Sequence, residues 1–231
     1  MKKSIEYYDA IYSWKDYFFE SERISHWIDK YVPDAKNLLE LACGTGQHIS
    51  HLHKYSCTGI DLCEDSLVLA RERAPHGQFI CSDMATFSSR DTFDVIVSMF
   101  GGVSYLEPRQ LKSAIRLWKD LLSKRGLLII EPWLEEHAID FQKPNFLHVD
   151  TDHGEIVRMV TPKREGQKCV LEFAFLGYEQ GQIVSFEQRD CLFMLEHHEL
   201  KEYFSTEGFK VVEECEGFLA GSTVWMLMKS S

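Results

Sequence analysis

Short apolar runs alternate with amphipathic stretches along the first 131 residues of the chain. The apolar runs are typical of buried strands, and the amphipathic stretches repeat their apolar positions with the spacing of a helix. The predicted strands cover residues 37–42, 56–61, 78–81, 93–98 and 126–131, and the predicted helices cover 47–54, 66–73 and 108–123. Strands that alternate with helices form a mainly parallel sheet covered on both faces, so this part predicts a βαβ series.

The rhythm changes after Trp133. Strand patterns follow one another directly at 156–161, 168–176 and 183–192, separated by glycine-containing turns at 164–167 and 179–182. A helix is then predicted over 197–207, with strands at 210–214 and 224–228 that complete the first sheet. We therefore predict an α/β fold: a Rossmann-like, doubly wound, mainly parallel seven-stranded sheet with a small antiparallel β insertion. Residues 1–139 and 193–231 would form the main domain, and 140–192 would form a lid or a dimer surface.

Composition narrows the classes of partner. The chain carries 25 Lys and Arg against 36 Asp and Glu, a net charge of -11, which repels phosphate backbones and anionic lipids. The start of the chain has no apolar leader, and no run approaches the roughly 18 apolar residues of a membrane span. The seven cysteines have no metal-ligand spacing, so we expect reduced thiols and no metal. These features predict a cytoplasmic protein without a nucleic-acid or membrane partner.

The sharpest motif is the stretch from Glu40 to Gly46, an apolar strand that ends in a Gly-x-Gly turn. Glycines there let the backbone approach a bound nucleoside. A dinucleotide fingerprint would place a third glycine near position 49, where this chain has Ile49, so a cofactor without phosphate is favoured over NAD(P).

Two more acids follow at the ends of the next strands. Asp61 lies 17 residues after Gly44, a spacing that suits hydrogen bonds to both ribose hydroxyls. Asp83 can accept from the exocyclic amine of an adenine, and Met84 offers a polarizable side chain to the face of the ring. Together the three segments predict one adenosyl pocket.

These segments resemble the adenosylmethionine-binding motifs of class I methyltransferases. The segments 8–17, 97–106 and 128–133 further resemble the TDP-aminosugar N,N-dimethyltransferases of macrolide biosynthesis, and the similarity spans most of the chain. The resemblance implies S-adenosyl-L-methionine as cofactor, S-adenosyl-L-homocysteine as product, and a homodimer formed through the inserted sheet. It also implies that Tyr8, Lys15 and Tyr17 lie near the cofactor and that Tyr105 faces the acceptor. The chain departs from that family at Gly221-Ser222-Thr223, where the sugar enzymes carry Gly-Arg-Gly, which removes a natural partner for a diphosphate.

Methyl transfer from a sulfonium depends on alignment and exclusion of water more than on acid–base catalysis. We expect Tyr105 to act as the catalytic residue by orienting the nucleophile, with Tyr12 and Trp133 beside it at the acceptor. No histidine–glutamate pair is evident at the sheet edge, since His48, His51 and His53 are expected on a helix surface near the cofactor. This favours a small-molecule amine, for example an aminosugar, as acceptor. The predicted cofactor-binding residues are Tyr8, Lys15, Tyr17, Glu40, Ala42, Gly44, Gly46, Asp61, Leu62, Asp83, Met84 and Met99.

Three alternatives remain open from the sequence: a small-molecule O-methyltransferase on the same scaffold, an adenosyl-binding module without turnover, and an NAD(P)-dependent oxidoreductase.

Overall fold

The computed structural model describes residues 2–151, 154–179 and 181–230. Its main sheet has seven strands in the order β10-β11-β5-β4-β1-β2-β3, and β11 runs antiparallel to both of its neighbours. The strands are β1 (Asn37–Leu41), β2 (Ser56–Asp61), β3 (Gln78–Cys81), β4 (Phe93–Ser98), β5 (Leu122–Ile130), β10 (Phe209–Glu216) and β11 (Thr223–Lys229). The doubly wound, mainly parallel sheet predicted from the alternation of elements is therefore confirmed.

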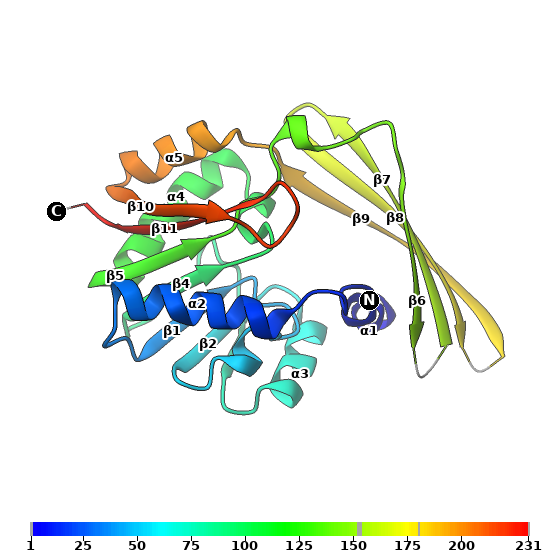
Figure 1. The fold of residues 1–231 in the computed structure, drawn as a ribbon, viewed down its shortest axis with the longest axis horizontal. Coiled ribbons are helices and arrows are strands. Elements are labelled where there is room, and N and C mark those ends of the chain that lie inside the picture. Colours follow the sequence, from blue (N-terminus) through cyan, green and yellow to red (C-terminus); the bar gives the residue numbers. More distant parts are fainter. Residues whose placement is uncertain (1, 152–153, 180, 231) are drawn as a thin grey trace.

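Two helices cover each face of this sheet (Figure 1). Helices α2 (Tyr17–Tyr31) and α3 (Glu64–Arg73) pack on one face, and α4 (Pro108–Leu121) and α5 (His197–Thr206) pack on the other. Local sequence sets where they begin. The Asp16 carboxylate accepts from the Phe19 amide at the start of α2, and Pro108 occupies the first turn of α4 behind a Glu107–Gln110 capping box.

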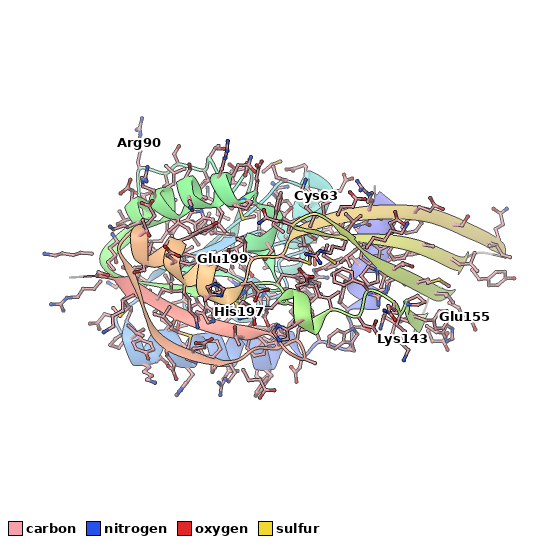
Figure 2. The ribbon with its side chains drawn as sticks, turned by 90° about the horizontal axis from the view of Figure 1, so that it is seen from above. Cys63, Arg90, Lys143, Glu155, His197 and Glu199 are labelled. Atoms are coloured by element: carbon pink, nitrogen blue, oxygen red, sulfur yellow. The ribbon has the colours of Figure 1, made fainter. Side chains whose placement is uncertain are left out.

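A second sheet of four antiparallel strands projects from one end of the main sheet (Figures 1 and 2). It consists of β6 (Asn145–Thr151), β7 (Gly154–Glu165), β8 (Lys168–Glu179) and β9 (Gln182–Phe193). The three strands predicted here are present and longer than expected, and Gly166 and Gly181 have the positive φ that their turns require. Gln180, in the second predicted turn, lies outside the described residues.

Strand β6 was not among the strands that the sequence predicted. It is an edge strand paired with β7 alone, and its Phe146 is 61% exposed. An edge strand with little buried surface leaves a weak pattern of apolar and polar positions, so the pairing with β7 decides its conformation.

The amino-terminal helix α1 (Lys2–Ile11) packs on the second sheet. Its Tyr7 and Ile11 are buried against Ile156, Phe173 and Phe175 on the inner face of that sheet. Helix α1 therefore lies between the two sheets (Figure 1) and joins them, although it precedes the main sheet in the chain.

The helix predicted over residues 47–54 is wrong. Only a single 3-10 turn, η1 (Ile49–His51), follows the glycine turn. His48 points inward and is hydrogen-bonded to the buried carboxylates of Glu20 and Glu40. These tertiary contacts set the backbone conformation of the segment, and it does not continue as a helix.

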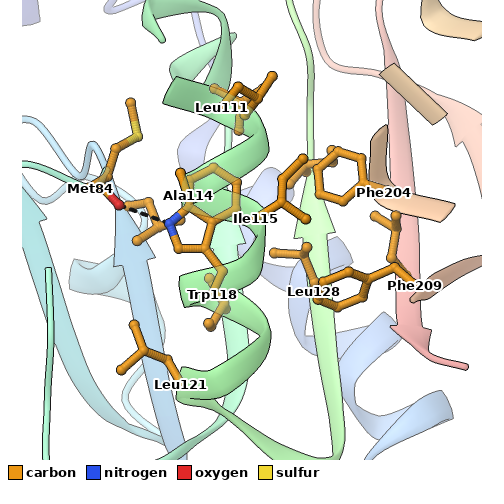
Figure 3. Close-up of a cluster of buried hydrophobic side chains, with 14 of the residues drawn as sticks. Met84, Leu111, Ala114, Ile115, Trp118, Leu121, Leu128, Phe204 and Phe209 are labelled. Atoms are coloured by element: carbon orange, nitrogen blue, oxygen red, sulfur yellow. Dashed lines mark hydrogen bonds between the residues drawn. The ribbon is translucent and has the colours of Figure 1, made fainter. Parts of the chain in front are cut away.

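The core on the α4 and α5 face is centred on Trp118 (Figure 3). Its ring is fully buried among Leu111, Ala114 and Leu121, and its indole N–H donates to the carbonyl of Met84 at 2.9 Å. Helix α4 is therefore fixed by packing and by one hydrogen bond to the segment that follows β3.

Replacing Trp118 should destabilise the fold strongly. We expect Trp118→Ala to lower the free energy of unfolding by about 3–5 kcal/mol through loss of buried area and a cavity. Trp118→Phe should cost about 1–3 kcal/mol because the Met84 carbonyl loses its donor. Urea unfolding measures both. The control is Leu117→Ala, whose side chain is 37% exposed on the same helix and which should change stability little; equal losses at both positions would contradict this account.

Candidate adenosyl and acceptor site

A cavity of about 1060 Å³ opens between the carboxyl ends of the main-sheet strands and the inner face of the second sheet. Ligands of open α/β sheets bind at this edge, where the loops after successive strands converge. Helix α1 forms part of the wall, together with β8 and β9. The predicted site residues that line the cavity are Tyr8, Tyr12, Ala42, Gly44, Asp61, Leu62, Met84, Met99, Tyr105 and Trp133.

The turn after β1 brings its backbone to the cavity. Gly44 has φ +54°, and a Cβ added there would meet no atom within 4 Å, so a side chain would project into free space. Gly46 is needed for another reason: its Cβ would lie 2.9 Å from that of Ala70, so it lets the turn pack on α3 and does not line the cavity. Ala42 and Phe100 also line the cavity with φ +54°, and such strained residues concentrate at binding sites.

Asp61 joins the ends of two neighbouring strands. One carboxylate oxygen accepts from the Gly44 amide at 2.9 Å, and the other accepts from the Cys63 amide at 2.8 Å. Each carboxylate oxygen can accept two hydrogen bonds, so the lone pairs that remain can receive the hydroxyls of a ribose. Leu62, beside it, also lines the cavity.

The loop after β3 contributes differently from the sequence prediction. Met84 lines the cavity and is 8% exposed, as expected of an apolar contact for a ring. The Asp83 side chain accepts from the Ala85 amide at 2.8 Å and is not part of the lining. Ser82, which no sequence signal singled out, lines the cavity beside Met84.

Helix α1 is tied to the glycine turn through Asp9. Its carboxylate accepts from the Thr45 hydroxyl at 2.7 Å and from the Gln47 side-chain amide at 3.2 Å, and it pairs with Arg73 of α3 at 2.6 Å. The helix that forms one wall of the cavity is therefore attached to the turn that forms its floor.

A buried chain of charged groups lies behind the glycine turn. Lys15 pairs with Glu20 at 2.6 Å, Glu20 with Nε2 of His48 at 2.9 Å, and Nδ1 of His48 with Glu40 at 2.8 Å. Tyr17 packs edge-on against His48. The sequence prediction that His48 lies on a helix surface is therefore wrong, and a histidine–glutamate pair does exist at this edge of the sheet.

Lys15, Tyr17 and Glu40, which were predicted to bind the cofactor, are not part of the cavity lining. Lys15 and Tyr17 line a neighbouring groove instead, and Glu40 is 2% exposed beneath the turn. One carboxylate oxygen of Glu40 is buried and has no partner among the described residues.

The two carboxylates control the protonation of His48. Burial by itself lowers the pKa of the imidazole, but the charges and hydrogen bonds of Glu40 and Glu20 outweigh burial and raise it to about 9. The pKa of Glu20 is lowered by His48 and Lys15 in spite of its burial. The pKa of His51, half-exposed nearby, is lowered by burial and by the charge of His48. Near neutral pH His48 is therefore an imidazolium that donates to both carboxylates.

The pKa of His48 predicts how stability depends on pH. The folded pKa is about 9 against 6.5 for an unperturbed histidine, so the contribution of the group is fully present below pH 6.5 and is lost as the pH rises through 9. NMR titration of the imidazole resonances, assigned with His48→Gln and His51→Gln, should place the pKa of His48 above that of His51. In His48→Gln the free energy of unfolding should fall less between pH 6.5 and 9 than it does in the wild type, because the titrating group is gone. A pKa of His51 above that of His48 would contradict the prediction.

The acceptor end of the cavity combines residues of both sheets. Tyr105 ends η2 (Gly102–Tyr105), which contacts β9, and Tyr105 and Asp190 of β9 both line this end of the cavity. The Tyr105 side chain is 49% exposed, toward the cavity that it lines, yet desolvation and the neighbouring acid raise its pKa far above the usual range. Tyr12 lines the same region, and Trp133 lines it with a buried indole N–H that has no partner in the described part of the chain. Asp190 is a residue that sequence reasoning missed, because nothing in its own strand marks it.

Outside the cavity, one group of side chains has the spacing of metal ligands. Donor atoms of Glu135, His137 and Glu196 lie within 4.8 Å of one another. Glu135 already accepts from the His197 amide at 2.9 Å and lies 3.6 Å from the His197 ring, which gives its charge a local partner. The expectation of no metal stays a prediction.

The fold and the cavity together define a Rossmann-like enzyme that binds an adenosyl cofactor without a dinucleotide motif. Residues 38–126 match a family described as a methyltransferase domain. The chain is 30% identical over 220 residues to the dTDP-3-amino-3,4,6-trideoxy-alpha-D-glucopyranose N,N-dimethyltransferase of Streptomyces venezuelae, which covers 93% of this chain and 92% of that relative. It is 26% identical to the dTDP-3-amino-3,6-dideoxy-alpha-D-glucopyranose N,N-dimethyltransferase of Streptomyces fradiae, over 89% of this chain and 83% of that one.

A solved structure gives the same result. The S-adenosylmethionine-bound amino pentose methyltransferase CalS10 of Micromonospora echinaspora superposes with a TM-score of 0.84 and 26% identity, over 94% of this chain and 92% of that one. The chain belongs to the S-adenosylmethionine-dependent methyltransferase family. The S-adenosylmethionine cofactor that the resemblance implied is thus confirmed, and NAD(P) is set aside. No described helix is long and apolar enough to cross a membrane.

Proposed function

We propose that this enzyme transfers a methyl group from S-adenosylmethionine to the amine nitrogen of an aminosugar. The observation that carries the proposal is the shared cavity: the Asp61 end, which fits the adenosyl group, is continuous with an end formed by Tyr12, Tyr105 and the second sheet. Relatives that match along most of the chain act on amino groups of sugars. The volume of about 1060 Å³ is large for a single small ligand, which suits a cofactor and an acceptor side by side.

In this proposal the cofactor is held by residues after the first four strands. Asp61 accepts the ribose hydroxyls, Gly44 admits the chain of the cofactor, and Met84 supports the adenine. Ala42, Leu62 and Met99 complete the apolar lining, and Tyr8 covers the site from α1. We assign indirect roles to Glu40, Gly46, Lys15, Tyr17 and Asp83, which hold the turns that carry these residues.

When bound, the cofactor supplies an electrophilic methyl group on a sulfonium. The protein's contribution is to align the acceptor nitrogen and to keep water away. The Tyr105 hydroxyl can orient the amine, while Tyr12 and Trp133 enclose the acceptor. His48 is held between two carboxylates behind the turn, so it is not the base that a hydroxyl acceptor would need. This favours nitrogen over oxygen.

The proposal is tested by incubating the enzyme with S-adenosylmethionine and a panel of aminosugars, simple amines and phenols. Mass spectrometry should detect methylated aminosugar together with S-adenosylhomocysteine. Methylation of phenols alone would contradict the proposed acceptor. If no compound of the panel leads to formation of S-adenosylhomocysteine, the enzyme does not act on these classes of acceptor and the proposal fails.

Asp61→Asn is the matched variant for the cofactor end. We expect it to weaken binding of S-adenosylhomocysteine by about 1–3 kcal/mol in calorimetry, because ribose hydroxyls lose a charged acceptor. Asp83→Asn should have a smaller effect, since its carboxylate already accepts from Ala85. Equal losses would return Asp83 to the adenosyl site.

We also propose that the enzyme is a homodimer formed through the outer face of the second sheet. That face exposes Phe146 (61%), Met159 (46%), Leu176 (48%), Tyr178 (54%) and Ile183 (74%), and the pairs Phe146–Met159 and Tyr178–Ile183 are cross-strand neighbours. Apolar side chains gathered on one exposed face are typical of interaction surfaces. The resemblance to sugar methyltransferases that dimerise through this insertion supports the same surface.

A charge in the centre of this face should separate the dimer. Leu176→Glu is expected to convert a dimer to a monomer in light scattering, because an isologous interface buries the new charge twice. Val68→Glu, at a 46% exposed apolar position on α3, serves as the control and should leave the mass unchanged. A wild-type monomer would contradict the proposal.

A cytoplasmic location is part of this proposal. It is supported by the seven cysteines, which are all free thiols and would stay reduced in that compartment. We also propose the division of the chain into a main domain (1–139 and 193–231) and an insertion (140–192).

A further inference from the structure

Asp190 carries an unbalanced charge at the acceptor end of the cavity. It lies on β9 opposite Leu171, and both residues line the cavity. Its carboxylate accepts from the Gln188 side-chain amide, a neutral donor, at 3.0 and 3.2 Å. Among the residues that the structure describes, no lysine, arginine or histidine forms an ion pair with it. Burial raises the pKa of this carboxyl although the neighbouring Gln188 amide and Tyr105 hydroxyl oppose the shift. A half-buried carboxylate without a cation is costly, and a cationic ligand would remove that cost.

The rest of the cavity repeats this charge pattern. Its described lining includes the acids Asp61, Glu187 and Asp190 and contains no lysine, arginine or histidine. The acceptor end is otherwise formed by apolar and aromatic side chains such as Leu171, Phe173 and Phe186. Such a surface attracts a cation and offers no charged donor to a phosphate.

The nearest arginine on the second sheet is already engaged. Arg158 of β7 donates to the side-chain oxygen of Asn145, and its guanidinium lies 6.0 Å from the centre of the Phe173 ring. Its Nε is buried and has no partner within the described ranges. Arg158 is not part of the cavity lining, so it does not present a diphosphate site there as the structure stands.

The loop between β10 and β11 supplies no cation either. The hydroxyl of Ser222, which is 3% exposed, donates to Oε1 of the buried Glu131 carboxylate at 2.7 Å. Oε1 of Glu131 also accepts from the Phe218 backbone amide at 2.8 Å. The loop is therefore fixed to the end of β5 by neutral donors.

We infer that Asp190 binds the amino group of the acceptor as an ammonium ion and accepts a proton from it, which frees the nitrogen lone pair for methylation, and that the acceptor is an aminosugar without a nucleoside diphosphate. The inference rests on the proposed function and narrows its substrate class. Tyr105 lines the same end of the cavity, so the amine would lie near the residue expected to orient it, at the junction of the two sheets. The aromatic side chains around it suit the apolar face of a sugar ring.

The test uses three ligands and the protein saturated with S-adenosylhomocysteine. They are an aminohexose with a free anomeric hydroxyl, the TDP ester of the same aminohexose, and the parent hexose with a hydroxyl in place of the amine. Calorimetry or saturation-transfer NMR measures binding without turnover. We expect the free aminohexose to bind more tightly than either the TDP ester or the parent hexose.

Asp190→Asn keeps the size of the side chain and removes its charge. We expect it to weaken binding of the free aminohexose by about ten- to hundredfold, because a hydrogen-bonded charge pair is lost, and to leave the weak binding of the parent hexose unchanged. Glu155→Gln is the control: Glu155 is exposed toward the far end of the second sheet (Figure 2) and should not affect binding. Unchanged thermal unfolding and unchanged affinity for S-adenosylhomocysteine establish that the Asp190→Asn variant is folded.

The outcomes separate the inference from the function on which it rests. If the TDP ester binds more tightly than the free aminohexose, the inference is overturned, most clearly when Arg158→Gln removes that preference. Methylation of the ester would in that case still support the proposed function. An Asp190→Asn variant that binds the aminohexose like the wild type also overturns it. If the wild type methylates neither aminosugar from S-adenosylmethionine, the proposed function itself fails.

Discussion

The hydrogen bond from the Gly44 amide to the Asp61 carboxylate holds together the ends of the two strands from which the site is built. Parallel strands β1 and β2 end at the same edge of the sheet, and this bond, together with the one from the Cys43 amide to the Ile60 carbonyl at 3.0 Å, holds the glycine turn against the second strand. The positive φ of Gly44 directs the turn around the cavity, and Asp61 keeps lone pairs for a ligand. The same contact therefore serves the fold and prepares the cofactor site.

Two further connections depend on this turn. Beneath it, the chain of charges from Lys15 through Glu20 and His48 to Glu40 joins the start of α2 to β1. Buried charges are tolerated there because each is paired and hydrogen-bonded to the next. Beside it, Asp9 attaches α1 to the turn, and the other face of α1 packs on the second sheet. The main sheet, the amino-terminal helix and the insertion thus meet around one cavity, and the end proposed for the acceptor is formed where η2 contacts β9.

Much of the main sheet was predictable because its signals are local. The buried strands β1 and β4 are continuous apolar runs, and α4 has a strong helical period with its own capping box, so their positions agree with the sequence within a few residues. The helix expected after Gly46 failed because a tertiary contact, the inward His48, competes with local helix preference. Strand β6 escaped because an edge strand needs its partner to be recognised.

Local sequence was sufficient for the fold class and for an adenosyl pocket, since both depend on short motifs at the ends of strands: a Gly-x-Gly turn after the first strand and an acid at the end of the next. The contribution of Asp190 and the inward position of His48 required the folded chain. Asp190 and Tyr105 are 85 positions apart, and His48, Glu20 and Glu40 come from different elements, so no local pattern relates them. Packing of whole elements brings Asp190 to the cavity that Tyr105 lines and brings His48 within hydrogen-bond distance of both carboxylates.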